Sequence, residues 1–204
     1  MSEQIGNEVT AFSHVMFKSS EAHGISLNLK LMSLRLFAAL SIPDDVAAQL
    51  LALMKGVAGA KWRPRENLHL TLRFFGEITE PVAEDLDAEL ETATRGIEPF
   101  ALRLKGAGSF GGVDPHALWI GAAESDSLKR LAAACEKAAR RVKLKPEPLK
   151  FTPHVTIAYL SGAALDRVQA FTAQHALFEM PAFDVAGFGL YSSVTRKSAP
   201  SLYR

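Results

Sequence analysis

The fold of this chain is organised around the stretch Asn67-Leu68-His69-Leu70-Thr71-Leu72-Arg73-Phe74-Phe75-Gly76, because a second stretch repeats its pattern. The second stretch is Phe151-Thr152-Pro153-His154-Val155-Thr156-Ile157-Ala158-Tyr159-Leu160. Each reads histidine, apolar residue, threonine, apolar residue within a run that predicts a β-strand. Side chains alternate between the faces of a strand, so the histidine and threonine share one face and their apolar neighbours share the other. Each strand therefore has a core face and a polar face that suits a ligand.

One His-x-Thr pattern is a weak signal, and a histidine in a sheet is usually a polar group satisfied by local hydrogen bonds. That structural alternative applies to each copy alone. Two copies in predicted strands favour a paired functional site, and the other four histidines, His14, His23, His116 and His175, lie outside the pattern.

The surrounding elements repeat as well. Periodicity and helix-start signals predict a first β-α-β-α-β unit with a strand at 33–40, a helix from Pro43, the His69 strand, a helix after Thr79 and a strand at 100–105. They predict a second unit with a strand at 117–121, a helix at 126–142, the His154 strand, a helix at 165–175 and a strand at 183–191. The histidines are 85 positions apart (154 − 69), which indicates an internal duplication.

A duplicated unit with approximate two-fold symmetry brings equivalent strands together. We therefore predict an α+β fold with pseudo-two-fold symmetry, whose two lobes, at about 33–106 and 117–192, flank a central cleft. The domain is expected to span 32–204. Residues 1–31 lack both a sustained period and the layout of a signal peptide, so we expect a loosely ordered extension, or alternatively a short helix near 9–17. The glycine-rich segment 105–112 is predicted to be a turn between strands.

Composition excludes several classes of function. With a net charge of +1, the chain has no global basic field for duplex nucleic acid or an anionic membrane. The single cysteine, Cys135, excludes an internal disulfide and fits a reducing compartment. No apolar run reaches the length of a membrane span. We expect a cytoplasmic monomer that does not enter membranes.

From about residue 34 to 203 the chain resembles the bacterial and archaeal RNA 2′,3′-cyclic phosphodiesterases, also called 2′-5′ RNA ligases, of the two-histidine phosphoesterase superfamily. The resemblance covers stretches in the family's order and spacing at 35–43, 62–77, 106–110, 118–121 and 151–156. It implies two lobes around a water-filled groove, and hydrolysis of an RNA 2′,3′-cyclic phosphodiester to a 2′-phosphomonoester. The reverse reaction would be 2′-5′ RNA ligation.

The resemblance also implies residue roles. His69 would be the proton donor and His154 the proton acceptor, while Thr71 and Thr156 would hold the phosphate. Tyr159 stands where many relatives have arginine and is a further candidate for substrate binding.

The residues support this chemistry independently. Opening a cyclic phosphodiester requires a base for water and an acid for the departing ribose oxygen, and imidazole can serve as either near neutral pH. Threonine hydroxyls can donate to the phosphate oxygens. By strand alternation Arg73 shares the face of His69, where it could neutralise phosphate or be a solvated charge. No His-Glu-x-x-His motif or cysteine pair is present, so we expect no metal and no cofactor.

Two basic clusters flank the motifs. They could guide single-stranded RNA, with Trp62, Phe75 or Tyr159 stacking on bases, or they could be ordinary solvated surface. Their members are Lys61, Arg63 and Arg65 before the first motif and Lys143, Lys145 and Lys150 before the second.

Three functional hypotheses remain open. The first is a cofactor-free hydrolase of RNA 2′,3′-cyclic phosphates. Its substrates would be RNA ends or small nucleotide cyclic phosphates. The second is a phosphodiesterase that acts on 2′-5′ oligoadenylate or a small cyclic nucleotide phosphate. The third is a non-catalytic RNA-binding module, which two intact motifs disfavour because binding alone does not need both imidazoles.

Overall fold

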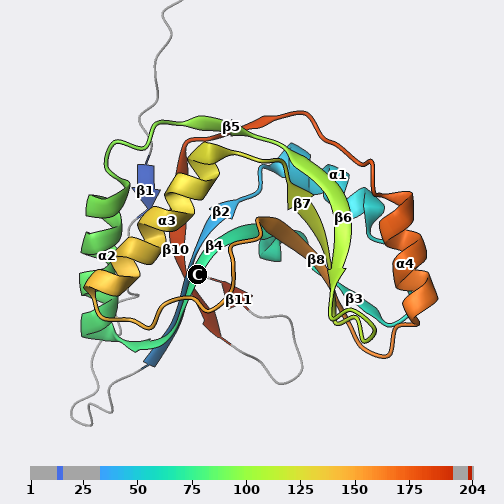
Figure 1. Ribbon diagram of the computed structural model, residues 1–204, viewed down its shortest axis with the longest axis horizontal. Coiled ribbons are helices and arrows are strands. Elements are labelled where there is room, and N and C mark those ends of the chain that lie inside the picture. Colours follow the sequence, from blue (N-terminus) through green and yellow to red (C-terminus); the bar gives the residue numbers. More distant parts are fainter. Residues whose placement is uncertain (1–12, 16–32, 195–201, 204) are drawn as a thin grey trace, which may run out of the picture.

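The computed structural model describes residues 13–15, 33–194 and 202–203 (Figure 1). The helices in this part of the chain are α1 (Asp44–Leu53), α2 (Glu80–Thr94), α3 (Asp126–Arg141), α4 (Leu165–Gln174) and the 3₁₀ helix η1 (Arg65–Asn67). The strands are β1 (Ser13–Val15), β2 (Ser33–Ser41), β3 (Ala60–Trp62), β4 (His69–Thr79), β5 (Phe100–Leu102), β6 (Leu104–Phe110), β7 (Ala117–Ala122), β8 (His154–Leu160), β9 (Phe183–Val185), β10 (Gly187–Val194) and β11 (Leu202–Tyr203). Among these residues no helix is both long and apolar enough to cross a bilayer.

One mainly antiparallel sheet contains strands from both halves of the chain in the order β1-β10-β2-β4-β8-β7-β6. The short strand β3 also pairs with β8, in the antiparallel direction. The histidine strands β4 and β8 are neighbours at the centre of the sheet. The last strand of each repeat crosses to the other side, since β6 pairs with β7 and β10 pairs with β2. The α+β fold with two lobes is confirmed, and each lobe of the sheet includes a strand from the other half of the chain.

The register of the two halves agrees position by position. β2 pairs with β4 as β7 pairs with β8, in the matching pairs Ser41–His69 and Gly121–His154, Leu40–Leu70 and Ile120–Val155, and Ala39–Thr71 and Trp119–Thr156. At the junction Leu70 pairs with Val155, and these two residues are 85 positions apart (155 − 70), as the histidines are. A residue that pairs with its own repeat equivalent lies on the pseudo-two-fold axis. The predicted symmetry is therefore visible in the hydrogen-bonded register.

Each histidine strand has an extra residue directly after its threonine. The pairing skips Leu72 on β4 and Ile157 on β8, and both side chains are buried. A β-bulge of this kind changes the faces that the following side chains take. Simple alternation therefore predicts side-chain directions only as far as the threonine of each motif.

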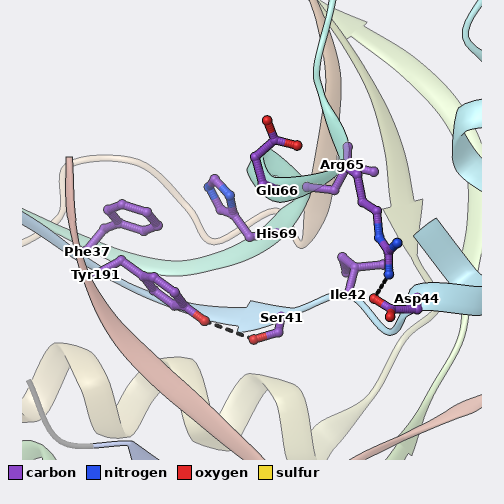
Figure 2. Close-up of a pocket in the computed structure, with 9 residues that line it drawn as sticks. Phe37, Ser41, Ile42, Asp44, Arg65, Glu66, His69 and Tyr191 are labelled. Atoms are coloured by element: carbon purple, nitrogen blue, oxygen red, sulfur yellow. Dashed lines mark hydrogen bonds and ion pairs between the residues drawn. The ribbon is translucent and has the colours of Figure 1, made fainter. Parts of the chain in front are cut away.

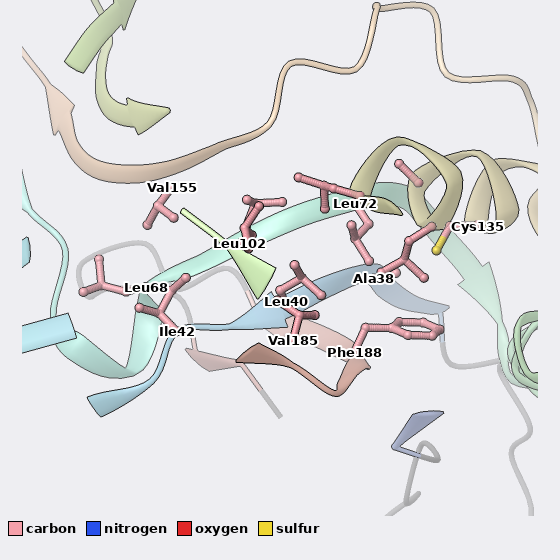
Figure 3. Close-up of a cluster of buried hydrophobic side chains, with 14 of the residues drawn as sticks. Ala38, Leu40, Ile42, Leu68, Leu72, Leu102, Cys135, Val155, Val185 and Phe188 are labelled. Atoms are coloured by element: carbon pink, nitrogen blue, oxygen red, sulfur yellow. The ribbon is translucent and has the colours of Figure 1, made fainter. Parts of the chain in front are cut away.

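The core lies on the face of the sheet opposite the histidines. Helices α2 and α3 pack together at one end of the sheet, on the left in Figure 1, while α1 and α4 lie at the other end, on the right. Between them β5 and β9 form a two-stranded sheet, with Phe100 paired to Val185. Leu102 of β5 and Val185 of β9 meet Leu40 and Leu72 in the apolar cluster of Figure 3. This cluster fixes the backs of the strands that carry the motifs.

Two sequence-based expectations are wrong. The segment 105–112 is mostly strand, since β6 pairs with β7 as far as Phe110. Its Gly108 lies under the Trp119 indole, where an added Cβ would overlap the ring. Gly108 thus allows close packing of a ring, and only Gly111 and Gly112, which have positive φ, belong to the turn after β6. In the N-terminal region, Ser13–Val15 is a strand parallel to β10 and not part of a helix at 9–17; the rest of 1–31 lies outside the described residues.

Candidate active site

The histidine and threonine of both motifs line one groove of about 1190 Å³. His69 and Thr71 flank Leu70 on β4, and His154 and Thr156 flank Val155 on β8, so the four polar side chains surround the Leu70–Val155 register pair. Leu70 and Val155 themselves point into the core and are fully buried. The structure thus brings together the four residues on which the sequence prediction depends.

His154 is held in one orientation by the backbone just before it. Its Nδ1 lies 2.6 Å from the carbonyl oxygen of Thr152. Because a carbonyl only accepts, Nδ1 carries the proton of the neutral ring, and Nε2 is the atom available as a base. Burial lowers the pKa of His154, and this hydrogen bond opposes the effect. Both observations describe a neutral imidazole with a basic Nε2.

His69 has the same local arrangement, since its ring hydrogen bonds to the backbone of Asn67, also two residues earlier. The pKa of His69 is lowered to about 4, mainly by burial and then by the Arg63 charge, while the Asn67 hydrogen bond works in the opposite direction. His154 adds a smaller lowering effect, so the two imidazoles interact electrostatically. In the free protein His69 is therefore neutral at pH 7.

Each imidazole packs against a phenylalanine from another strand of the sheet, Phe37 of β2 or Phe110 of β6. The ring centroids of His69 and Phe37 are 4.9 Å apart, and those of His154 and Phe110 are also 4.9 Å apart. These apolar contacts remove water from the rings, which explains the burial effect on both pKa values. Both phenylalanines lie in stretches that carry the family resemblance, 35–43 and 106–110, but the sequence gave neither of them a role.

A smaller pocket of about 210 Å³ adjoins the groove on the far side of His69. Figure 2 shows the His69 ring between Phe37 and Glu66, with the hydroxyl groups of Ser41 and Tyr191 nearby. The two hydroxyl oxygens are 2.9 Å apart. His69 therefore lines both spaces, and Glu66 is an acidic residue on the side of the smaller pocket.

Arg73 lines the groove together with His69 and Thr71, but the bulge at Leu72 separates it from their polar strand face. Its guanidinium is 7% exposed, with Nε 2.6 Å from a Glu136 carboxylate oxygen and Nη1 3.0 Å from a Glu147 carboxylate oxygen. Its Nη2 also donates to the carbonyl of Lys145 at 2.6 Å. These contacts favour a structural role, joining β4 to α3 and to the segment that leads to His154, over the phosphate contact expected from alternation.

The bulges instead present an aromatic residue to the groove three positions after each threonine. Phe74 is 52% exposed and Tyr159 is 49% exposed, and both line the groove. Phe75, expected to stack on bases, is buried, and Trp62 packs on Phe171 of α4. Phe74 was missed because the sequence alone gives no sign of the bulge.

The folded structure places the members of the two basic clusters in different surroundings. Arg63 and Lys150 line the groove, while Arg65 forms an ion pair with Asp44 beside the smaller pocket. Lys145 contributes its carbonyl to the Arg73 contacts. Within 13–15, 33–194 and 202–203 no group of three or more His, Cys, Asp or Glu side chains has the placement of a metal site.

A duplicated antiparallel sheet with a His-x-Thr pair from each repeat in one groove defines the two-histidine phosphoesterase class. The chain belongs to the 2′-5′ RNA ligase superfamily, whose family model matches residues 42–196. An RNA 2′,3′-cyclic phosphodiesterase of Aeropyrum pernix is 32% identical over 138 residues, which are 66% of this chain and 77% of the relative. The corresponding protein of Thermotoga maritima is 33% identical over 129 residues, or 61% of this chain and 68% of the relative.

Solved structures agree with this assignment. The crystal structure of TT0787 from Thermus thermophilus superposes with a TM-score of 0.70 at 27% identity, over 83% of this chain and 93% of that one. The Escherichia coli LigT complex with 3′-AMP has a TM-score of 0.68 at 22% identity, over 85% of this chain and 95% of that one. The second likeness is one of fold.

Proposed function

We propose that this protein hydrolyses RNA 2′,3′-cyclic phosphodiesters to 2′-phosphomonoesters by acid–base catalysis in the groove. The observation that carries the proposal is the symmetric placement of His69, Thr71, His154 and Thr156 around the Leu70–Val155 pair. Relatives that are RNA 2′,3′-cyclic phosphodiesterases support the choice of substrate.

In the proposed reaction the phosphate lies between the two imidazoles. His154 Nε2 takes a proton from water as the water oxygen forms a bond to phosphorus. The bond between phosphorus and the ribose 3′ oxygen breaks in line with this attack, and protonated His69 gives its proton to that oxygen. The product is a 2′-phosphomonoester with a free 3′ hydroxyl. Attack by an RNA 5′ hydroxyl in place of water, with the same bond to the 3′ oxygen breaking, forms a 2′-5′ linkage.

Thr71 and Thr156 have a different task in this proposal. Their hydroxyl groups donate to the two non-bridging oxygens, on which negative charge increases as the reaction proceeds. Because each threonine is two positions from its histidine on the same strand face, the donors and the proton-transfer groups are held by the same backbone.

Substrate binding allows His69 to take up from solvent the proton that it lacks in the free protein. The pKa of His69 is lowered to about 4 by burial and then by the Arg63 charge. A phosphodiester anion beside the ring stabilises its protonated form and raises that pKa. Catalysis then starts from one charged and one neutral imidazole.

Other features bear on substrate size and on where the activity resides. A groove of about 1190 Å³ is larger than the roughly 300–1,000 Å³ typical of small-molecule pockets, which favours an oligonucleotide end over a mononucleotide.

Activity on 2′-5′ oligoadenylate or small cyclic nucleotides is the second candidate, because Phe74 and Tyr159 offer base-stacking surfaces without sequence selection. We further propose that residues 32–204, acting as a cytoplasmic monomer, hold the whole activity.

The test is hydrolysis of a panel of 2′,3′-cyclic-phosphate-ended oligonucleotides, 2′-5′ oligoadenylate and cyclic mononucleotides. The expected order of kcat/KM places the cyclic-ended oligonucleotides first, and preference for another substrate selects the second candidate.

EDTA should leave the rate unchanged, because the two imidazoles perform both proton transfers. A chain starting at Met32 should retain kcat, and light scattering should give one chain per particle. Binding of RNA without turnover of any panel member would contradict the proposal.

A further inference from the structure

Arg63 is anchored between the two motifs. It follows β3, which pairs with β8 through Lys61 and Tyr159. Its backbone N–H donates to the carbonyl of Ile157 at 2.8 Å, and Ile157 is the bulged residue of the second motif. Pro64 then directs the chain into η1 and the first motif. The backbone of Arg63 therefore has a fixed position relative to both histidine strands.

The side chain of Arg63 reaches the groove from this anchor. It is 7% exposed and lines the groove together with both histidines and both threonines. Its guanidinium carbon lies 5.1 Å from the centre of the Tyr159 ring. Its charge acts on His69, whose pKa is lowered first by burial and then by this cation. A buried positive charge thus lies near the reacting groups.

We propose that Arg63 binds the phosphodiester of the substrate, with its guanidinium held against the Tyr159 ring. The assignment rests on the proposed function of the groove and adds a phosphate ligand that lies outside the two His-x-Thr motifs. A guanidinium can donate two parallel hydrogen bonds to oxygens of one phosphate group. An aromatic face orients the guanidinium plane without using its N–H donors.

The electrostatics of the site give this contact a second consequence. Arg63 opposes protonation of His69 while the groove holds no anion, since the two positive charges would repel each other. A phosphodiester bound to Arg63 compensates its charge and adds a negative charge near the imidazole. Protonation of His69 is thereby coupled to the arrival of substrate.

The experiment measures binding of inorganic phosphate by calorimetry and turnover of a cyclic-phosphate-ended trinucleotide. Arg63→Met should weaken phosphate binding about 10- to 100-fold, as expected for loss of hydrogen bonds to a charged group. Arg65→Met is the matched control, because it removes the same charge two residues away, outside the groove. It should change phosphate affinity less than twofold. Equal phosphate affinity in Arg63→Met and the parent protein would overturn the assignment.

A second measurement separates a phosphate ligand from a structural arginine. In Arg63→Met, NMR titration should show a higher pKa for His69 in the free protein and a smaller increase on adding phosphate. A double variant, Arg63→Met with Tyr159→Arg, puts the cation on the neighbouring groove position and should recover at least tenfold of the lost phosphate affinity. If Arg63→Met does not fold, Arg63→Lys decides, since a single ammonium cannot reproduce the paired contact and should bind phosphate more weakly.

The outcomes distinguish this proposal from the proposed function. Phosphate binding that depends on Arg63 in a protein that cleaves no cyclic phosphate would retain the ligand and reject the reaction. Cleavage of cyclic phosphates with unchanged kcat/KM and phosphate affinity in Arg63→Met would retain the reaction and reject the ligand.

Discussion

Leu70 and Val155 are backbone partners where β4 meets β8, and each is the repeat equivalent of the other. Both side chains have 0% exposure and point away from the groove, toward the core. The flanking residues on the opposite face are the two histidines and two threonines of the motifs. The packing of this pair therefore determines the spacing of the groups that we propose to act on phosphate.

Leu70→Ala should destabilise the protein by about 2–5 kcal/mol, because it leaves a cavity at the junction of the two lobes. It should also lower kcat/KM, since the β4 and β8 motifs can then shift relative to each other. Urea unfolding measures the first effect. The matched control is Leu177→Ala, whose side chain is 94% exposed and whose loss should change stability by less than about 0.5 kcal/mol. Similar stability for the two variants would contradict the core position of Leu70.

His69→Ala and His154→Ala should each reduce kcat/KM by roughly 10²–10⁴-fold, the usual value for loss of a general acid or base. A cyclic phosphate with sulfur at the 3′ bridge separates the roles, because a thiolate leaves without a proton. His69→Ala should recover much of its rate on the sulfur substrate, and His154→Ala should not. The reverse pattern would exchange the roles of the two residues. Thr71→Ala and Thr156→Ala are the controls, with equal losses on both substrates.

Stability should fall as the pH decreases from about 6.5 toward 4. The pKa of His69 is lowered to about 4 in the folded protein by burial and the Arg63 charge, while 6.5 is its ordinary value. Between these values the unfolded chain binds a proton that the folded chain does not, so acid favours unfolding by at most about 3 kcal/mol. The pKa of His154 is lowered in the same direction by burial, which adds to the effect.

Urea unfolding of the parent protein and of a His69→Gln, His154→Gln double variant measures this dependence. The double variant should show a smaller decrease in the free energy of unfolding over the same pH range. An identical decrease in both proteins would assign the pH dependence to other groups.

Arg73→Met should destabilise the protein by about 3–5 kcal/mol, because it leaves two carboxylates without their buried cation. Burial acts to raise the pKa of Glu136, but hydrogen bonds from Arg140 and Arg73 outweigh it and keep that pKa below its ordinary value. The variant should therefore raise the pKa of Glu136, which NMR can follow. Arg95→Met removes an exposed arginine that pairs with Glu91 at 3.8 Å, and should change stability by less than about 1 kcal/mol.

Much of the candidate site could be predicted from the sequence, because its signals are local. Strand alternation places a histidine and its threonine on one face and the apolar residues on the other, and this holds for both motifs as far as Thr71 and Thr156. The 85-residue repeat predicted that β4 and β8 would be related by a two-fold axis, and the Leu70–Val155 pair lies on it. A repeat and a two-residue period can both be read from one chain without knowledge of its contacts.

The tertiary structure alone decided the side-chain directions after each threonine and the surroundings of each histidine. The bulges at Leu72 and Ile157 depend on how β2 and β7 pair with the motif strands, and after the first of them Arg73 is buried while Phe74 is exposed in the groove. The exchange of β6 and β10 brings Phe110 against His154 and places Tyr191 beside Phe37. Arg63 reaches the groove because it directly follows β3, which pairs with β8. Pairing between distant strands sets all of these positions, and local propensity carries no information about it.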